Sequence, residues 1–292
     1  MNTSRFLTRT DVRRSLSSQL HPKLKWSIVC LSHDPKKVDK ALHSFYHQTI
    51  SRMGINRKMR REMRTISKKY GGLGLFDLNI DNLGERMHFI TSHWDLPTAT
   101  GQTLRHAYEM FRISVGLGGH IFERDFKLLG KLAEPCWFKH TWELCHKFDS
   151  PIKFDTKFEV PLMRERDITL MDAFFDTGIW QISDLETLNI VRRYKCVYSK
   201  SDITQPDGRT VLPSMMSNDP GNSDWTFPEE KPTGTQLQLW CDAIQHLTSA
   251  ELVLPRSIGR YINPPHKKTG WYLSSNSSYL YKKSENGTFD TF

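Results

Sequence analysis

The sequence predicts a mainly α-helical protein, a helical bundle with a small α+β part at its C-terminus. Apolar residues recur every three or four positions through most of the chain up to about residue 194, as they do in amphipathic helices. Several of these runs begin at helix-capping residues or end at glycine. Residues 271–292 instead alternate polar and apolar side chains in the manner of β-strands.

The first predicted helix begins after Asp34, because an aspartate can cap the first turn and Pro35 fits the first helical position. Its apolar residues continue at helical spacing until Gly54 ends the run. A second helix is predicted over Arg57–Ser67, with basic residues around most of its circumference. Its narrow apolar seam consists of Met59, Met63 and Ile66.

Helical spacing predicts further helices downstream. Their apolar seams run through residues 80–94, 104–115, 138–148 and 171–175, then a helix begins near 183 and another spans 237–247. Gly116 is expected to end one of them, and Ser183 with Glu186 is expected to form a capping box. Residues 199–234 are rich in Ser, Asp, Gly and Pro and are predicted to be loops around short extended pieces. Asn286-Gly287 is typical of a hairpin turn between strands.

Three regions are expected from these patterns. They are a basic helical segment at 1–78, a helical bundle at 79–155, and a region of helices and short strands at 156–292. The longest apolar run, Trp26–Leu31, contains a serine and is far shorter than the about 20 residues that cross a membrane, so no membrane partner is expected. Five cysteines without paired spacing favour free thiols and an intracellular location, nuclear or cytoplasmic.

The positive charge is concentrated in the first quarter of the chain. Residues 1–70 contain 17 Lys and Arg against 4 Asp and Glu, whereas the remaining residues carry 24 basic against 28 acidic side chains. Such a local excess attracts polyanions and favours nucleic acid over a merely solvated helix surface. The predicted phosphate-binding residues are Arg52, Arg57, Lys58, Arg60, Arg61, Arg64, Lys68 and Lys69.

Glycines follow the basic helix directly. Gly71, Gly72 and Gly74 can adopt conformations closed to other residues, and they are predicted to form a hinge between the basic helix and the next bundle. Tyr70 precedes them and is expected to be a core or hinge aromatic rather than a surface on which bases stack.

The sequence offers no catalytic centre. Polymerases need carboxylates that converge on two metal ions, and this chain contains no adjacent Asp-Asp pair. Asp77 and Asp81 are expected to serve the start of a helix. The glycine-rich segments lack the Lys-Ser/Thr pair of a phosphate-binding loop, and no nucleophile stands out. We therefore expect no catalytic residue, no metal ligand and no cofactor.

One group of Cys and His residues needs an explanation, namely Cys136, His140, Cys145 and His146. The two cysteines are too far apart for a zinc knuckle, and Cys145 shares an apolar seam with Trp142. A core cysteine is therefore favoured over a metal ligand. A metal-dependent enzyme built on this group is kept as a weaker alternative.

An ordered series of short motifs resembles the reverse-transcriptase-like proteins of eukaryotic non-LTR retrotransposons. The first match is the segment from Gln48 to Leu78, which includes the basic helix and a Gly-Gly-Leu-Gly sequence at 71–74. The later matches are residues 163–167 with 170–172, 188–192, 201–203 with 207–209, 271–273 and 280–281.

The resemblance covers most of the chain from about residue 20, and it implies the thumb-like and post-thumb region of such a polymerase. The fingers and the palm with its paired aspartates are then expected to precede Met1, outside this sequence. A region of this kind is expected to bind template–primer, DNA or RNA without sequence preference, and to have no catalysis of its own. The polymerase core of the same element is a further expected partner.

A helical scaffold that binds protein partners is the alternative from a different class. The chain has 8 Trp and 16 Phe, and aromatic residues of this kind anchor protein interfaces. Binding to such a partner is expected to survive high salt, unlike contacts with phosphates.

Overall fold

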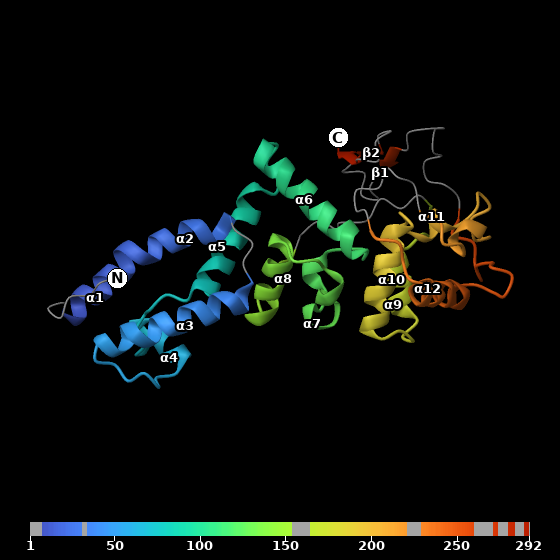
Figure 1. Ribbon diagram of the computed structural model, residues 1–292. Coiled ribbons are helices and arrows are strands. Elements are labelled where there is room, and N and C mark those ends of the chain that lie inside the picture. Colours follow the sequence, from blue (N-terminus) through green and yellow to red (C-terminus); the bar gives the residue numbers. More distant parts are fainter. Residues whose placement is uncertain are drawn as a thin grey trace. The chain divides into compact units, whose positions relative to one another are not determined.

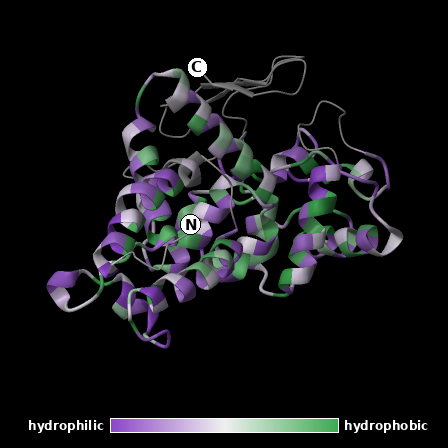
Figure 2. Ribbon diagram, turned by 60° about the vertical axis from the view of Figure 1, so that its left-hand side comes forward, coloured by the Kyte–Doolittle hydropathy of each residue, from purple (hydrophilic) through white to green (hydrophobic). Residues whose placement is uncertain are grey.

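The computed structural model describes residues 8–30, 34–153, 164–220, 229–259, 271–273, 280–283 and 289–291. The chain is mainly helical, as the sequence predicts (Figure 1). It divides into two compact units, Met1–Leu104 with Pro135–Ile152, and Arg105–Glu134 with Lys153–Phe292. Most helices carry both hydrophilic and hydrophobic residues, as amphipathic helices do (Figure 2).

The first unit is built from helices at both ends of its sequence range. They are α1 (Arg9–Ser15), the π-helical turn η1 (Leu16–Leu20), α2 (His21–Cys30), α3 (Pro35–Arg52), α4 (Arg61–Thr65), the 3-10 turn η2 (Lys68–Tyr70), α5 (Leu78–His93) and α8 (Trp137–Lys147). Helix α5 packs against α2, α3 and α8, and α3 also packs against α1 and α8. The predicted segment 1–78 shares this unit with residues 79–104 and 135–152 of the predicted bundle, whereas residues 105–134 belong to the other unit.

Two helix starts confirm the sequence analysis. Asp34 accepts a hydrogen bond from the backbone N–H of Lys36, with Pro35 at the first position of α3. Asp77 accepts from the N–H groups of Asn79 and Ile80 at the start of α5. These carboxylates satisfy backbone donors that have no partner inside the helix.

The helix at residues 9–30 was not expected from the sequence. Thr8 and Asp11 form a capping box at its start, and its apolar side chains pack on the end of α3. The buried cluster that results contains Val12, Leu16, Ile50, Met53 and Leu75. The members of this cluster come from the helix at 9–30, from α3 and from the segment after η2, so the cluster joins these elements. Burial of each such side chain contributes about 1.5–3 kcal/mol to the stability of the fold.

Arg86 connects α5 to α8 inside the first unit. Its guanidinium is fully buried and donates to Asn82 Oδ1 at 2.8 Å, the Trp137 carbonyl at 2.8 Å and Thr141 Oγ1 at 2.9 Å. The group also lies 4.9 Å from the centroid of the Trp137 ring. Burial lowers the pKa of Arg86 to about 10, a value at which the side chain is still charged at neutral pH.

The division between the units falls within α6 (Ala99–Val115). The second unit continues with η3 (Ile121–Glu123), α7 (Phe126–Leu129), η4 (Gly130–Leu132), α9 (Leu170–Asp176), α10 (Ile182–Tyr194), α11 (Lys200–Ile203), η5 (Pro213–Met215) and α12 (Gly234–Leu247). Helices α9, α10 and α12 pack on one another, and Trp240 is fully buried there with its ring 5.8 Å from that of Phe174.

Two local expectations in this unit were wrong. Helix α10 begins one residue before Ser183, because the carboxylate of Asp184 accepts the backbone N–H of Gln181 at 3.0 Å and forms the capping box with that residue. The stretch 199–234 is not all loop, because the Asp202 carboxylate accepts from the N–H of Ser199 at 2.9 Å and starts α11. Residues 221–228 of this stretch lie outside the described residues.

Strands are present near the C-terminus, as the alternation predicts. β1 (Trp271–Leu273), β2 (Leu280–Lys283) and β3 (Phe289–Thr291) form an antiparallel sheet in the order β1-β2-β3. The predicted turn at Asn286-Gly287 lies outside the described residues. In the described part of the chain, none of the helices combines the length and the apolar character needed to cross a membrane.

Candidate nucleic-acid interface

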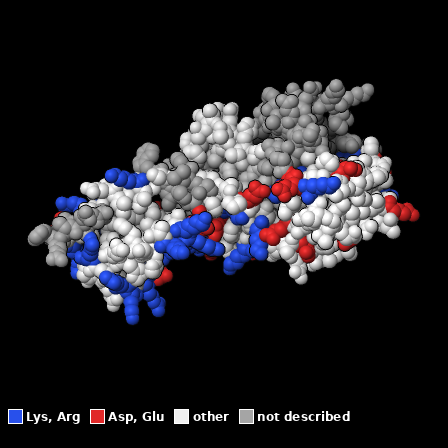
Figure 3. Space-filling view, in the orientation of Figure 1, with Lys and Arg blue, Asp and Glu red and all other residues white. Residues whose placement is uncertain are grey.

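The predicted phosphate-binding residues all lie in the first unit, between the end of α3 and η2. Arg52 is the last residue of α3, Arg57 and Lys58 lie in the following turn, and Lys68 and Lys69 belong to η2. All of the predicted cations are exposed except Arg64, which is half-buried. Lys and Arg side chains stand out around α4 on the face that Figure 3 shows. We call the surface that these cations form the basic surface.

The predicted basic helix at 57–67 is wrong in length, because α4 covers only Arg61–Thr65. In a longer helix the carbonyls of Met63 and Arg64 would accept from residues four positions later. They accept instead from the N–H groups of Leu73 and Leu75, at 3.0 and 2.9 Å. The segment after η2 thus supplies the N–H donors for the carbonyls that would otherwise accept hydrogen bonds within a longer α4. The predicted seam is also not buried, since Met63 is 43% exposed.

The glycine segment folds back closely on α4. Gly71 and Gly74 have φ values of +82° and +59°, which suit glycine. A Cβ atom at Gly72 would lie 2.1 Å from the carbonyl oxygen of Ile66, so only glycine fits this approach without displacement. The N–H of Gly74 also donates to that oxygen at 2.9 Å. These contacts fix the path of the backbone between the basic residues and α5.

Arg61 already has a carboxylate partner. Its Nε donates to Asp77 Oδ2 at 2.8 Å and its Nη2 lies 2.6 Å from the same oxygen. The side chain of Asp77 is only 6% exposed, whereas that of Arg61 is 43% exposed. The pair therefore attaches α4 to the start of α5, and Asp77 neutralises part of the charge that Arg61 brings to the basic surface.

Two further cations join the basic surface from α1, and the sequence analysis missed both. Arg13 Nη2 donates to the carbonyl of Leu73 at 2.7 Å, within the glycine segment. The guanidinium of Arg9 lies against Gly54, where an added Cβ would be 3.0 Å from its Nη2. The capping box formed by Thr8 and Asp11 is the signal that could have revealed α1 and these residues.

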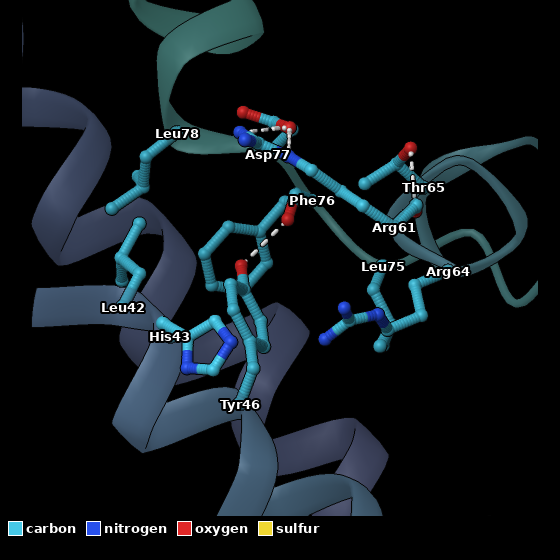
Figure 4. A pocket seen from close by; sticks show the side chains of 10 residues that line it. All are labelled: Leu42, His43, Tyr46, Arg61, Arg64, Thr65, Leu75, Phe76, Asp77 and Leu78. Atoms are coloured by element: carbon cyan, nitrogen blue, oxygen red, sulfur yellow. Dashed lines mark hydrogen bonds and ion pairs between the residues drawn. The ribbon is translucent and has the colours of Figure 1, made fainter. Parts of the chain in front are cut away.

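A small pocket of about 110 Å³ lies beside the basic surface (Figure 4). Its apolar walls come from α3, from the segment before α5 and from α5 itself. Tyr46 donates its hydroxyl proton to the carbonyl of Phe76 at 2.6 Å, so its ring rather than a free hydroxyl faces the pocket. The side chains that line it are Leu42, His43, Tyr46, Arg61, Arg64, Thr65, Leu75, Phe76, Asp77 and Leu78.

Arg64 lines this pocket together with Arg61. Its guanidinium points across the pocket toward Tyr46 in Figure 4. The Nε atom is buried and has no hydrogen-bond partner within the described part of the chain. Burial of a charged donor without a partner is unfavourable, so an acceptor that enters the pocket would relieve this cost. Sequence analysis placed Arg64 among phosphate ligands and gave no sign of the pocket.

Two histidines of α3 lie next to Arg64. His43 and His47 have their Nε2 atoms 3.1 Å apart and their ring centroids 4.2 Å apart. Burial, the neighbouring His43 and the cations Arg64 and Arg57 lower the pKa of His47. An anion bound there would counter the effect of these cations, because it favours the protonated imidazole.

Tyr70 was expected to be a core or hinge aromatic, and the core alternative is wrong, since 74% of its surface is exposed. The Nζ atom of Lys69 lies 5.8 Å from the centroid of its ring. An exposed ring beside a cation is a surface on which a base can stack. Tyr70 is the last residue of η2, and Gly71 caps the turn in a left-handed conformation.

The two cysteines of the Cys and His group pack in or cap α8. Cys145 is 2% exposed in the core, and burial raises the pKa of its thiol to about 12. Cys136 caps α8 by accepting from the N–H of Lys139 at 3.4 Å. Within the described ranges, no three His, Cys, Asp or Glu side chains are grouped to hold a metal ion.

Several motif residues that carried the family resemblance form hydrogen bonds within the second unit. Arg164 donates to the carbonyls of Gln205, Pro206 and Gly259, at 3.2, 3.0 and 3.1 Å. Arg192 is fully buried and donates to the carbonyl of Ile113 at 2.7 Å. Arg164 thus holds loops in place and Arg192 joins α10 to α6, so the described contacts assign both side chains to the architecture of the unit.

A scan of protein-family models and searches of curated proteins and of solved structures find no match to this chain.

Proposed function

We propose that the first unit binds nucleic acid through backbone phosphates, with the basic surface as the contact. The observation that carries the proposal is the convergence of cations from separate elements. Arg9 and Arg13 of α1 reach the turn after α3 and the glycine segment, where the predicted cations lie. Nearly all of the predicted cations are exposed, and exposed cations can reach phosphates without a rearrangement of the fold.

Binding of this kind is electrostatic and independent of sequence. Each phosphate that a cation neutralises releases condensed counterions, so affinity falls steeply with salt. Phosphate contacts position a strand but carry no sequence information directly. We therefore expect both DNA and RNA to bind. The fixed backbone of the glycine segment supports this function because it limits the motion of the nearby cations.

We also propose that the chain derives from the thumb-like and post-thumb region of a retrotransposon reverse transcriptase. This proposal rests on the order of the sequence motifs. It makes template–primer the natural ligand and the polymerase core of the same element a partner. A direct test is to mix the chain with such a core and measure whether primer extension on long templates becomes more processive.

The experiment for nucleic-acid binding is fluorescence anisotropy with a labelled duplex across a range of salt concentrations. If about four phosphates are neutralised, a plot of log K against log salt has a slope of about −3.6. Substitution of Arg57, Lys58 and Arg60 by Gln removes three exposed cations that lie close together in the sequence. For every phosphate that is no longer neutralised, the magnitude of the slope falls by about 0.9.

A matched control removes the same number of exposed cations from the second unit. Lys127, Lys131 and Arg256 are exposed there, and their substitution by Gln lowers the net charge equally. We expect the control to keep the slope of the unmodified protein. Equal reductions in both triple variants would show that only net charge matters. Absence of binding at low salt would overturn the proposal and favour the protein scaffold.

A further inference from the structure

The pocket beside the basic surface has the wrong chemistry for a phosphate. Leu42, Leu75 and Leu78 line it together with the rings of Tyr46 and Phe76 (Figure 4). Burial of a doubly charged group among such side chains is costly. The carboxylate of Asp77 also lies in the lining and would repel an anion. An occupant therefore needs a largely apolar body.

The polar groups of the pocket limit the occupant further. The Tyr46 hydroxyl is committed to the Phe76 carbonyl, and Asp77 accepts from Arg61 and from the first turn of α5. Arg64 offers a buried donor, and the imidazole of His43 lines the pocket as well. The preferred ligand is thus flat and apolar on its faces, with hydrogen-bond acceptors on its edge.

The size of the pocket points to a single ring system. Pockets for drug-sized ligands are typically about 300–1,000 Å³, whereas this one has about 110 Å³. A whole nucleotide does not fit such a volume, but one base can enter it while its sugar and phosphate remain outside. Exposed cations of the basic surface lie within a few residues of the segment 61–65 that lines the pocket, namely Arg60, Lys68 and Lys69.

We propose that this pocket takes one unpaired nucleobase of a strand whose phosphates lie on the basic surface. The proposal rests on nucleic-acid binding and adds a preference to it. A paired base is held in the duplex and cannot enter, so the protein favours an unpaired strand or a duplex with an overhang. Stacking against Tyr46 and Phe76 is tolerant of sequence, because every base has a π-face.

The test compares three labelled probes at one salt concentration. They are a blunt duplex, the same duplex with a three-nucleotide overhang, and an overhang of equal length that lacks bases. The two overhangs carry equal numbers of phosphates. Stacking of one base on aromatic side chains corresponds to an affinity gain of about tenfold. We expect the overhang with bases to bind about tenfold tighter than the abasic overhang.

A variant that fills the pocket, Thr65→Trp, tests whether the tighter binding of the overhang with bases arises in this pocket. Thr65 lines the pocket, and its hydroxyl bonds only to carbonyls of its own helix among the described groups. Thr91→Trp is the matched control, because Thr91 is exposed on α5 and also bonds to carbonyls of its own helix. We expect Thr65→Trp to lose the gain and to bind the blunt duplex normally. Thr91→Trp should keep the gain.

The outcomes separate the two proposals. If no probe binds, the proposed function itself fails. If all three probes bind but the abasic overhang binds as tightly as the overhang with bases, the nucleobase pocket is wrong and phosphate binding stands. A gain that persists in Thr65→Trp would also overturn the pocket, because the base would then stack elsewhere, for example on Tyr70. The probe comparison on the unmodified protein needs no variant to fold.

Discussion

Substitution of Gly72 by alanine is the sharpest test of how the basic surface is built. The added Cβ would lie 2.1 Å from the carbonyl oxygen of Ile66, 2.7 Å from its carbonyl carbon and 2.9 Å from its Cβ. All three distances are far below normal van der Waals contact. The clash is with backbone as well as with a Cβ atom, so rotation of a side chain cannot relieve it. The glycine segment must move away from α4.

The cost of this movement follows from the hydrogen bonds that it breaks. The N–H of Gly72 donates to the Ser67 carbonyl at 3.2 Å, and that of Gly74 donates to the Ile66 carbonyl at 2.9 Å. Each such bond contributes about 0.5–1.5 kcal/mol, and strain from an added atom in a packed site costs about 1–3 kcal/mol. We therefore expect Gly72→Ala to lower the free energy of unfolding of the first unit by about 2–6 kcal/mol.

Two other glycines provide controls, one in which alanine should lower the free energy of unfolding and one in which it should raise it. Gly71 has a φ of +82° with nothing within 4 Å of an added Cβ, so Gly71→Ala should cost only the about 1–2 kcal/mol of a left-handed residue. Gly84 is exposed within α5 and also has open space around it. Gly84→Ala should stabilise the unit by about 0.5–1 kcal/mol, because alanine loses less conformational freedom in a helix.

Urea unfolding followed by circular dichroism measures these changes. Hydrogen exchange read by mass spectrometry then locates them. In Gly72→Ala the amides of Leu73, Gly74 and Leu75 should lose protection, because they donate to carbonyls of α4 and of Ile66 at its end. The reasoning is refuted if Gly72→Ala unfolds like the unmodified protein, or if Gly71→Ala is the more damaging of the two.

Buried and shielded side chains provide three further tests. Arg86→Met should lower the free energy of unfolding by about 3 kcal/mol in denaturant titrations, because it removes three hydrogen bonds that a buried guanidinium makes within the first unit; an unchanged midpoint would contradict this. Nucleic-acid affinity should rise as the pH falls below about 6.5, the ordinary pKa of histidine, because the pKa of His47 is lowered from that value in the free protein and bound phosphate raises it, so that binding takes up a proton; His47→Gln should weaken this pH dependence in anisotropy titrations, and the same curve in both proteins would exclude the role. The Cys145 thiol, with its pKa raised to about 12 by burial, should resist alkylation by iodoacetamide at about pH 8 until urea unfolds the chain, and rapid labelling in the native state would show that α8 opens.

The sequence predicts helices well where their signals are local. Asp34 with Pro35 marks the start of α3, and the apolar seam around Trp240 marks α12. In each case the cap or the seam lies within the helix that it defines. The same locality explains the error at α10. Two possible capping boxes overlap there, the predicted one of Ser183 with Glu186 and the observed one of Gln181 with Asp184.

The candidate site is predicted less well because long-range contacts shape it. The cations at 52–69 can be read from composition, and their exposure follows from their charge. The length of α4 cannot be read this way, since the donors that end it come from Leu73 and Leu75. The contribution of α1 depends on the packing of its apolar side chains against Ile50 and Met53, which lie more than thirty residues away in the sequence.

These long-range contacts change the physical nature of the basic surface. An isolated helix that carries so many like charges on its sides would repel itself and lose order. Here Asp77 compensates Arg61, and the carbonyl of Leu73 accepts from Arg13. The glycine segment is anchored in the buried cluster beneath by its apolar end at residue 75. The positions of the cations are therefore fixed by the packing of the buried cluster rather than by the helix propensity of their own segment. We expect phosphate binding to depend on buried residues such as Leu16 as strongly as on the arginines themselves.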